Sequence, residues 1–147
     1  MEIELMTYGH PLWERTAAFA ENCSWRAGPV LAEMMRKNAF RGPERVVAAH
    51  EEGRIVGYCT FAENDELPEG SGYTPFVGFV FVDEGARGKR LSEKMIAAAA
   101  AYARSLGYGA LYIMSGEEGL YEKYGFEKLG EMETIYGTVD RLFVKKL

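Results

Sequence analysis

Hydrophobic residues follow two different spacings along the 147-residue chain, and these spacings separate strands from helices. An unbroken run of apolar and glycine residues at 76–82 predicts a strand buried on both faces, at the centre of a sheet covered by helices. After a polar turn, apolar residues recur at helical spacing from Leu91 to Leu106, which predicts a helix that ends at Gly107. The rest of the chain is arranged around this unit of strand, turn and helix.

The same patterns predict the other elements. Helical spacing recurs at 12–20 and again after Gly28-Pro29, and two β-rich runs separated by Glu52-Gly53 predict a hairpin. The predicted strands are 2–6, 45–51, 54–61, 76–82, 110–114, 126–135 and 141–147, with helices at 12–20, 28–35, 91–106 and around Tyr121. This order, β-α-α-β-β-β-α-β-α-β-β, predicts one α/β (α+β) domain over residues 1–147.

Composition narrows the class of protein. The net charge of −5 argues against a nucleic-acid partner, because phosphate binding requires a basic surface. No apolar run reaches the ~20 residues of a membrane span, and the acidic N-terminus does not read as a signal peptide. Cys23 and Cys59 lack metal-binding spacing, and neither His10 nor His50 has clustered ligands in the sequence. We therefore predict a cytoplasmic protein with reduced cysteines, no bound metal and no membrane partner.

The polar turn at 83–89 has the chemistry of an anion site. Its two glycines and the following helix N-terminus offer free backbone N–H groups, and Arg87, Lys89 and Arg90 add positive charge. The turn is not a Walker loop, because only two residues separate its glycines, and no G-x-G-x-x-G dinucleotide fingerprint follows the strand. The alternative is a solvated basic turn that only caps the helix.

Two segments resemble the signatures of the GNAT N-acetyltransferase family. Arg87-Gly88-Lys89-Arg90-Leu91-Ser92 follows an apolar strand, as does the family's acetyl-CoA-binding segment of Arg or Gln, two residues, Gly, one residue, and Gly or Ala. Arg90 replaces the first motif glycine, and Ser92 replaces the last small residue. LYEKYGF at 120–126 resembles the late signature, a short helix with a Tyr that ends in Gly-Phe. Tyr121 matches the family's catalytic Tyr, although taken alone it is better explained as a packed aromatic.

The resemblance implies a GNAT fold, a mixed and largely antiparallel sheet of about seven strands with helices on both faces. It also implies acetyl transfer from acetyl-CoA to an amine in a ternary complex, with Tyr121 as general acid. Acetyl-CoA is expected to bind along the strand and the turn, at Val80, Phe81, Val82, Arg87, Gly88, Lys89, Arg90, Leu91 and Ser92. The alternative is a non-catalytic CoA-binding sensor, because Gly78 has no side chain where some family members carry a His or Glu base.

The acceptor is expected to be a small-molecule amine or an amino-terminal group, bound by a monomer or a homodimer. Trp25 lies between the first two helices and is a candidate substrate contact, although a core or rim tryptophan is the simpler explanation. The acidic loop at 62–72 supplies Glu63, Asp65 and Glu66, which either face a cationic acceptor or belong to a solvated connection. A water relay or a carboxylate such as Glu63 is the candidate base.

Overall fold

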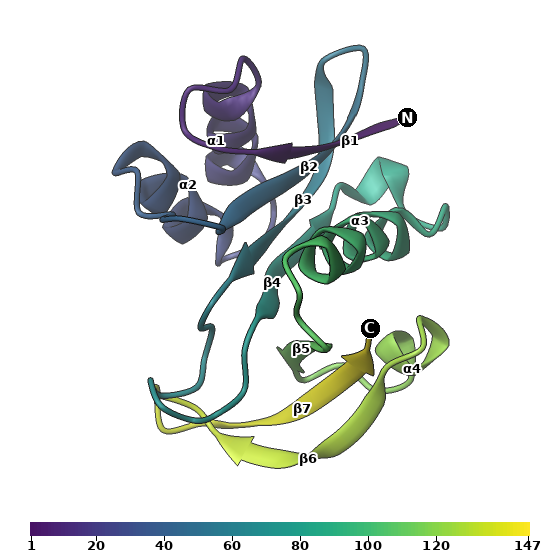
Figure 1. Cartoon of the computed structure of the whole chain (residues 1–147). Helices are drawn as coiled ribbons and strands as arrows, with labels where there is room; N and C mark the ends of the chain where they lie inside the picture. The colour runs from purple at the N-terminus through teal and green to yellow at the C-terminus, as the bar shows by residue number, and fades with distance from the viewer.

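A single sheet of seven strands runs through the computed structural model, which describes residues Met1–Leu147 (Figure 1). The strands are β1 (Glu2–Met6), β2 (Arg45–Glu51), β3 (Arg54–Ala62), β4 (Phe76–Val82), β5 (Ala110–Ser115), β6 (Glu127–Glu133) and β7 (Val139–Lys146). Their order across the sheet is β1-β2-β3-β4-β5-β7-β6, and every neighbouring pair is antiparallel except β4 and β5. The predicted mixed, largely antiparallel sheet is confirmed.

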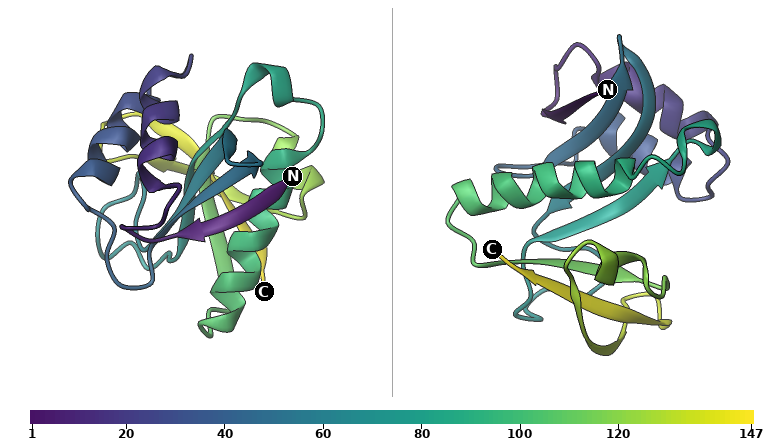
Figure 2. Two further views of the ribbon diagram at one scale, coloured as in Figure 1. Left: turned by 90° about the horizontal axis from the view of Figure 1, so that it is seen from above. Right: turned by 90° about the vertical axis from the view of Figure 1, so that its right-hand side faces the viewer.

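Helices cover both faces of this sheet, as Figures 1 and 2 show. They are α1 (Trp13–Asn22), α2 (Gly28–Arg36), α3 (Leu91–Ser105) and α4 (Leu120–Lys123), with a short 3-10 turn η1 (Glu84–Ala86). Side chains of α1 and α2 form one apolar core with β1, β2 and β3, whereas α3 and α4 form a second core on the opposite face. No helix has the length and apolar character needed to cross a bilayer.

Turn residues act where the sequence predicts them. Glu52 and Gly53 both have positive φ angles, 51° and 85°, which is the two-residue turn that suits the twist of a β-hairpin. Gly107 has a φ of 93° directly after α3. The N–H of Tyr108 donates to the carbonyl of Ala103 at 3.1 Å, so the helix ends in a Schellman motif.

The two parallel strands β4 and β5 separate soon after they meet. Only two residue pairs join them, Phe76 with Tyr112 and Val77 with Ile113. Beyond Val77, β4 continues to Val82 while paired to β3 alone. One edge of β4, from Gly78 onward, therefore faces a gap at the centre of the sheet, next to the first turn of α3.

Candidate active site

A cleft opens where β4 and β5 separate, and it has two connected chambers. The large chamber, about 860 Å³, reaches the α1–α2 loop, the β3–β4 loop and β7. The small chamber, about 550 Å³, lies at the turn that precedes α3. Both are lined by Val80, Phe81, Arg87, Glu117 and Tyr121, so these residues mark the junction between the two chambers.

The small chamber presents unpaired backbone donors. The N–H groups from Gly88 through Glu93 donate to no acceptor in the chain, and the first helical bond of α3 starts at the N–H of Lys94. Gly88 has a φ of 86°, and no atom lies within 4 Å of the position that a Cβ would take there. The turn therefore offers an exposed row of N–H groups at the positive end of the α3 dipole, the arrangement that binds phosphate.

The three cations of this turn have different surroundings. Arg90 adopts a φ of 55°, the left-handed conformation that glycine favours, at the position where the family's motif has a glycine. Its guanidinium forms a fork with Glu93, with N···O distances of 2.6 and 2.8 Å. Arg87 donates from Nε to the carbonyl of Val82 at 2.9 Å. Arg87 and Lys89 form no ion pair, so both cations are free for a bound anion. Arg87 lines both chambers, whereas Lys89 is exposed and lies outside their lining.

The free edge of β4 offers main-chain groups to the gap. The N–H of Asp83 donates to Val56 on β3 at 2.8 Å. Because successive N–H groups along a strand point to opposite sides, those of Val82 and Val80 face the gap. The Val82 carbonyl already accepts from Arg87, which leaves the Val82 N–H and both groups of Val80 for an added strand.

Tyr121 is both a packed aromatic and a lining residue of the cleft. It is 5% exposed, and its ring contacts Tyr124, Phe126 and Phe143 in the core under α4. Burial raises the pKa of its phenol to about 12, although a hydrogen bond with Ser115 opposes the shift. The hydroxyl is therefore protonated at neutral pH and can act as a donor at the junction of the chambers.

Tyr124 has a different setting from Tyr121. Its hydroxyl lies 2.7 Å from Oγ of Ser92, so it ties α4 to the first turn of α3. The Arg90 guanidinium lies over the Tyr124 ring, 5.6 Å from its centroid. Tyr124 and Ser92 line only the small chamber.

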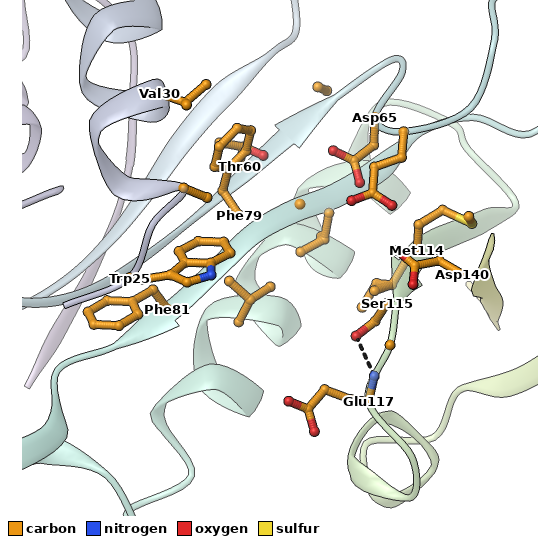
Figure 3. A pocket seen from close by; sticks show the side chains of 18 of the residues that line it. Trp25, Val30, Thr60, Asp65, Phe79, Phe81, Met114, Ser115, Glu117 and Asp140 are labelled. Carbon is orange, nitrogen blue, oxygen red and sulfur yellow. Dashed lines mark hydrogen bonds between the residues drawn. The ribbon is translucent and has the colours of Figure 1, made fainter. Parts of the chain in front are cut away.

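Three carboxylates gather in the large chamber, two from the β3–β4 loop and one from β7. They belong to Asp65, Glu66 and Asp140 (Figure 3 labels the two aspartates). The carbonyl of Glu66 accepts the N–H of Ile135 at 2.8 Å, which fixes the loop to the β6–β7 hairpin. Burial, with a hydrogen bond to Asp140, raises the pKa of Glu66 to about 8. Its Oε2 is buried without a hydrogen-bond partner.

The structure brings Trp25, Asp65 and Glu66 into the cleft, whereas the Glu63 side chain is exposed and lies outside its lining. Trp25 stacks on Phe81 with ring centroids 6.0 Å apart and planes 4° apart. In Figure 3 these rings line one side of the large chamber, opposite Asp65 and Asp140.

Asp140 and Glu117 are lining residues that sequence reasoning missed. Asp140 lies at the start of β7. A polar residue is common at a strand start that follows a turn, so the sequence shows no sign of a functional role there. Its place beside Asp65 comes from strand order, because β7 pairs with β5. Glu117 lies in the glycine-rich loop before α4, three residues before the LYEKYGF segment at 120–126, so its position in the sequence was a usable signal.

A separate cluster lies at the β1 end of the sheet. The sequence shows no clustered ligands near His50, but the structure places Glu2 and Glu4 beside it, with ligand atoms within 4.8 Å of one another. The Nδ1 of His50 accepts the N–H of Gly53 at 3.0 Å, so Nε2 carries the proton and donates to Glu4 at 3.0 Å. The group is thus satisfied as a hydrogen-bonded cluster, and a metal at Nε2 must displace that proton.

Family comparison agrees with this fold and cleft. The model of the acetyltransferase (GNAT) family matches residues 10–126, which include both signatures and the cleft residues from Trp25 to Tyr121. The chain therefore belongs to the GNAT acetyltransferase family. No curated protein sequence matches it significantly.

Solved structures with the same fold extend over the whole chain. Aminoglycoside 6'-acetyltransferase type Ii has a TM-score of 0.77 at 17% identity, over 99% of this chain and 97% of that one. A GNAT family acetyltransferase from Elizabethkingia anophelis, with acetyl-CoA bound, has a TM-score of 0.67 at 16% identity, over 99% and 97%. A ribosomal-protein-alanine N-acetyltransferase from Brucella melitensis has 0.63 at 20% identity, over 100% of both chains. These similarities confirm the GNAT fold.

Proposed function

We propose that the protein transfers an acetyl group from acetyl-CoA to an amino group of a small cationic acceptor while both are bound in the cleft. The observation that carries this proposal is the meeting of two unlike chambers at Tyr121 and Val80. One chamber has an anion-binding turn, and the other has a cluster of carboxylates. A direct transfer needs this arrangement, because the acyl donor and the amine must approach the same point from opposite sides.

The residues of the small chamber fit acetyl-CoA. Its pyrophosphate is matched by the free N–H groups at 88–93 and by Arg87, a lining cation without an ion pair, while Lys89 is exposed on the same turn. Its pantetheine arm carries amides that can pair with Val80 and Val82 as an added strand on β4. Bound acetyl-CoA in the neighbour from Elizabethkingia anophelis also supports this assignment.

Acetyl-CoA supplies an acetyl group activated as a thioester. The main-chain N–H of Val80 lies at the junction of the chambers and can donate to the oxyanion that develops on the thioester carbonyl, an interaction typically worth 2.7–4 kcal/mol. The Val80 carbonyl and the Val82 N–H then remain for the amides of the pantetheine arm. The Tyr121 hydroxyl then donates its proton to the departing sulfur. The position of Tyr121 at the junction of the chambers supports this role, and the phenol is protonated at neutral pH. Burial, which raises its pKa to about 12, makes it a weaker acid than an ordinary tyrosine.

The charge of the large chamber favours a cationic acceptor. Its carboxyl groups belong to Asp65, Glu66, Glu84, Glu117 and Asp140, and Arg87 lies at the border with the small chamber. Glu66 adds little negative charge at neutral pH, because its pKa is raised to about 8. Such a surface raises the local concentration of cations. Trp25 and Phe79 add aromatic faces that can pack against an apolar body or an alkylammonium group. An acceptor with a cationic amine on a partly apolar frame matches both features.

Acetyl-CoA should stabilise the protein through the Gly88 turn. Ligand at 100 times its Kd is expected to add about 2.7 kcal/mol to the free energy of unfolding. Gly88→Asp should abolish most of this gain by placing a carboxylate against the phosphates, as thermal denaturation with and without acetyl-CoA will measure. Gly88→Asn is the matched control, because it has the same backbone strain at a φ of 86° without the charge. Equal ligand-induced shifts in the two variants would remove this turn as the phosphate site.

The acidic chamber should select cationic acceptors. In the double variant Glu117→Gln/Asp140→Asn we expect KM for a diamine to rise about tenfold, because attraction of roughly 1–2 kcal/mol is lost. Glu66 is left unchanged, because its pKa of about 8 leaves it mostly uncharged at neutral pH. KM for a monoamine without a second positive charge should change less. The difference between the effects on the two acceptors should shrink at high salt. Glu69→Gln, exposed in the β3–β4 loop, is the control. Equal effects on both acceptors at every salt concentration would contradict the selection.

One experiment distinguishes the proposed acetyltransferase from the alternative function, a CoA-binding sensor without turnover. An amine library is incubated with the protein and acetyl-CoA, and the products are identified by mass spectrometry. N-acetylated products that require the protein support the enzyme. Stabilisation by acetyl-CoA with no product from any amine favours the sensor, for which the lack of a side chain at Gly78 is the supporting observation.

A further inference from the structure

The carboxylate of Asp65 fills the space that a side chain at position 78 would occupy. A Cβ built on Gly78 would lie 2.6 Å from Oδ1, 3.0 Å from Cγ and 3.3 Å from Oδ2 of Asp65, its three nearest atoms. The β3–β4 loop thus delivers a carboxylate directly onto β4, at a residue that has none of its own. Any side chain at position 78 would displace that carboxylate.

The contact lies at the point where the sheet opens. Gly78 is the first β4 residue beyond the last pair with β5, Val77 with Ile113. The next residue, Phe79, has a φ of 50°, a strained conformation for an aromatic residue, beside a register shift between β3 and β4. Strain of this kind is often held at functional sites. Gly78, Phe79 and Asp65 all line the large chamber (Figure 3 labels Phe79 and Asp65).

We propose that Asp65 is the general base of the reaction, and that its carboxylate, held over Gly78, replaces a basic side chain on β4. This inference rests on the proposed acetyl transfer to an amine. It also replaces Glu63 as the candidate base, because the Glu63 side chain is exposed outside the cleft.

The proton balance is as follows for an acceptor that binds as an ammonium ion. Asp65 takes one proton from the ammonium and later releases it to solvent. The neutral nitrogen forms a bond to the acetyl carbonyl carbon, and the carbon–sulfur bond breaks with its electron pair on sulfur. The sulfur takes a proton from Tyr121, and the second proton lost by the nitrogen restores the phenol through solvent. The products are an amide, the free thiol and one released proton.

The surroundings of Asp65 suit a base at neutral pH. The titratable and charged groups that line the chamber with it are Glu66 on the same loop, Tyr136 between β6 and β7, Asp140 on β7, Glu117 after β5, Tyr121 on α4, and Glu84 and Arg87 before α3. Burial raises the pKa of Asp65 to about 6. The negative charge of Asp140 also raises this pKa, whereas a hydrogen bond from the Glu66 backbone lowers it. Asp65 is then ionised at pH 7.5 yet more basic than an ordinary aspartate.

Asp65→Asn tests the proposal with two amines. For an alkylamine, which is protonated at neutral pH, kcat/KM should fall 10²- to 10⁴-fold, the usual contribution of a general base. For an electron-poor amine that is already neutral, the loss should be less than about tenfold, because no proton needs removal before attack. The wild-type alkylamine profile should level off above a midpoint near pH 6, whereas the variant should keep rising about tenfold per pH unit as free amine accumulates.

Gly78→Ala provides a second variant that leaves Asp65 chemically intact. The added Cβ should push the carboxylate away, so its alkylamine defect should resemble that of Asp65→Asn, and the double variant should be no worse than either. Glu69→Gln is the control. Equal losses for both amines, or an unchanged pH profile in an active Asp65→Asn protein, would overturn the role of Asp65 alone. A wild-type protein that acetylates no amine would instead overturn the proposed function, and the role of Asp65 with it.

Discussion

Replacement of Tyr121 by Phe should lower kcat by 10²- to 10⁴-fold while the affinity for acetyl-CoA stays close to that of the wild type. Phe keeps the ring contacts with Phe126 and Phe143, so the change deletes only the hydroxyl at the junction of the two chambers. That hydroxyl is proposed to act when the thiolate leaves, a charge absent from the ground state, and the loss should therefore appear in kcat. Single-turnover rates and thermal shifts with acetyl-CoA measure the two quantities.

Tyr124→Phe is the matched control for this prediction. It removes a hydroxyl from the same helix end, but one that is bonded to Ser92 and directed to the small chamber alone. We expect this variant to weaken acetyl-CoA binding without a large fall in the single-turnover rate. If Tyr121→Phe retains the wild-type single-turnover rate, Tyr121 is a packing residue and the proton donor lies elsewhere.

The strand, turn and helix proposed to bind acetyl-CoA were the elements that the sequence predicted best, because their information is local. The apolar run of β4, the glycine turn and the helix that follows are contiguous, and each has a pattern that physical chemistry can interpret. The resemblance to the GNAT fold, with which the element order agrees, then predicted the sheet and its covering helices. Local patterns did not show that Arg90 is paired with Glu93, since an i, i+3 ion pair at a helix start depends on side-chain conformation.

The proposed acceptor side depends on contacts that no local pattern encodes. Asp65 and Glu66 were candidates only because their loop is acidic, and Glu63 was equally attractive on that basis. Only the folded loop, fixed by the bond between Ile135 and the Glu66 carbonyl, turns Asp65 inward and leaves Glu63 outside. The absence of a side chain at Gly78 was visible in the sequence as a missing base. The structure gives it a different meaning, as the room that Asp65 requires.

The same burial that suits Asp65 to act as a base must lower the stability of the fold. Its folded pKa of about 6 lies above the ordinary value of 3.8, so the native state holds the proton more tightly than the unfolded chain. The contribution of protonated Asp65 to the free energy of unfolding is complete below about pH 4 and is lost as the pH rises to about 6. At pH 7.5 this contribution is absent. The pKa of Glu66 is raised to about 8, so its ionisation also lowers the free energy of unfolding, but at higher pH than that of Asp65.

Asp65→Asn should therefore stabilise the protein at pH 7.5 while it impairs the reaction of alkylamines. The rise in the pKa of Asp65 from 3.8 to about 6 corresponds to about 3 kcal/mol of unfolding free energy. Asn avoids this penalty because it carries no charge. For a domain of this size, a gain of that magnitude raises Tm by about 6–12 °C. Near pH 4 the difference between the two proteins should nearly vanish, because wild-type Asp65 is then protonated as well.

Chemical denaturation of both proteins at about pH 4 and pH 7.5 measures this difference directly. Glu69→Gln, an exposed carboxylate in the same loop, should match the wild type at both pH values and so excludes a general effect of net charge. A stabilisation of equal size at the two pH values would mean that Asn improves packing and that Asp65 is not a buried charge. A stabilisation confined to the higher pH, together with the loss of alkylamine turnover, would show that the carboxylate is retained for catalysis at the expense of stability.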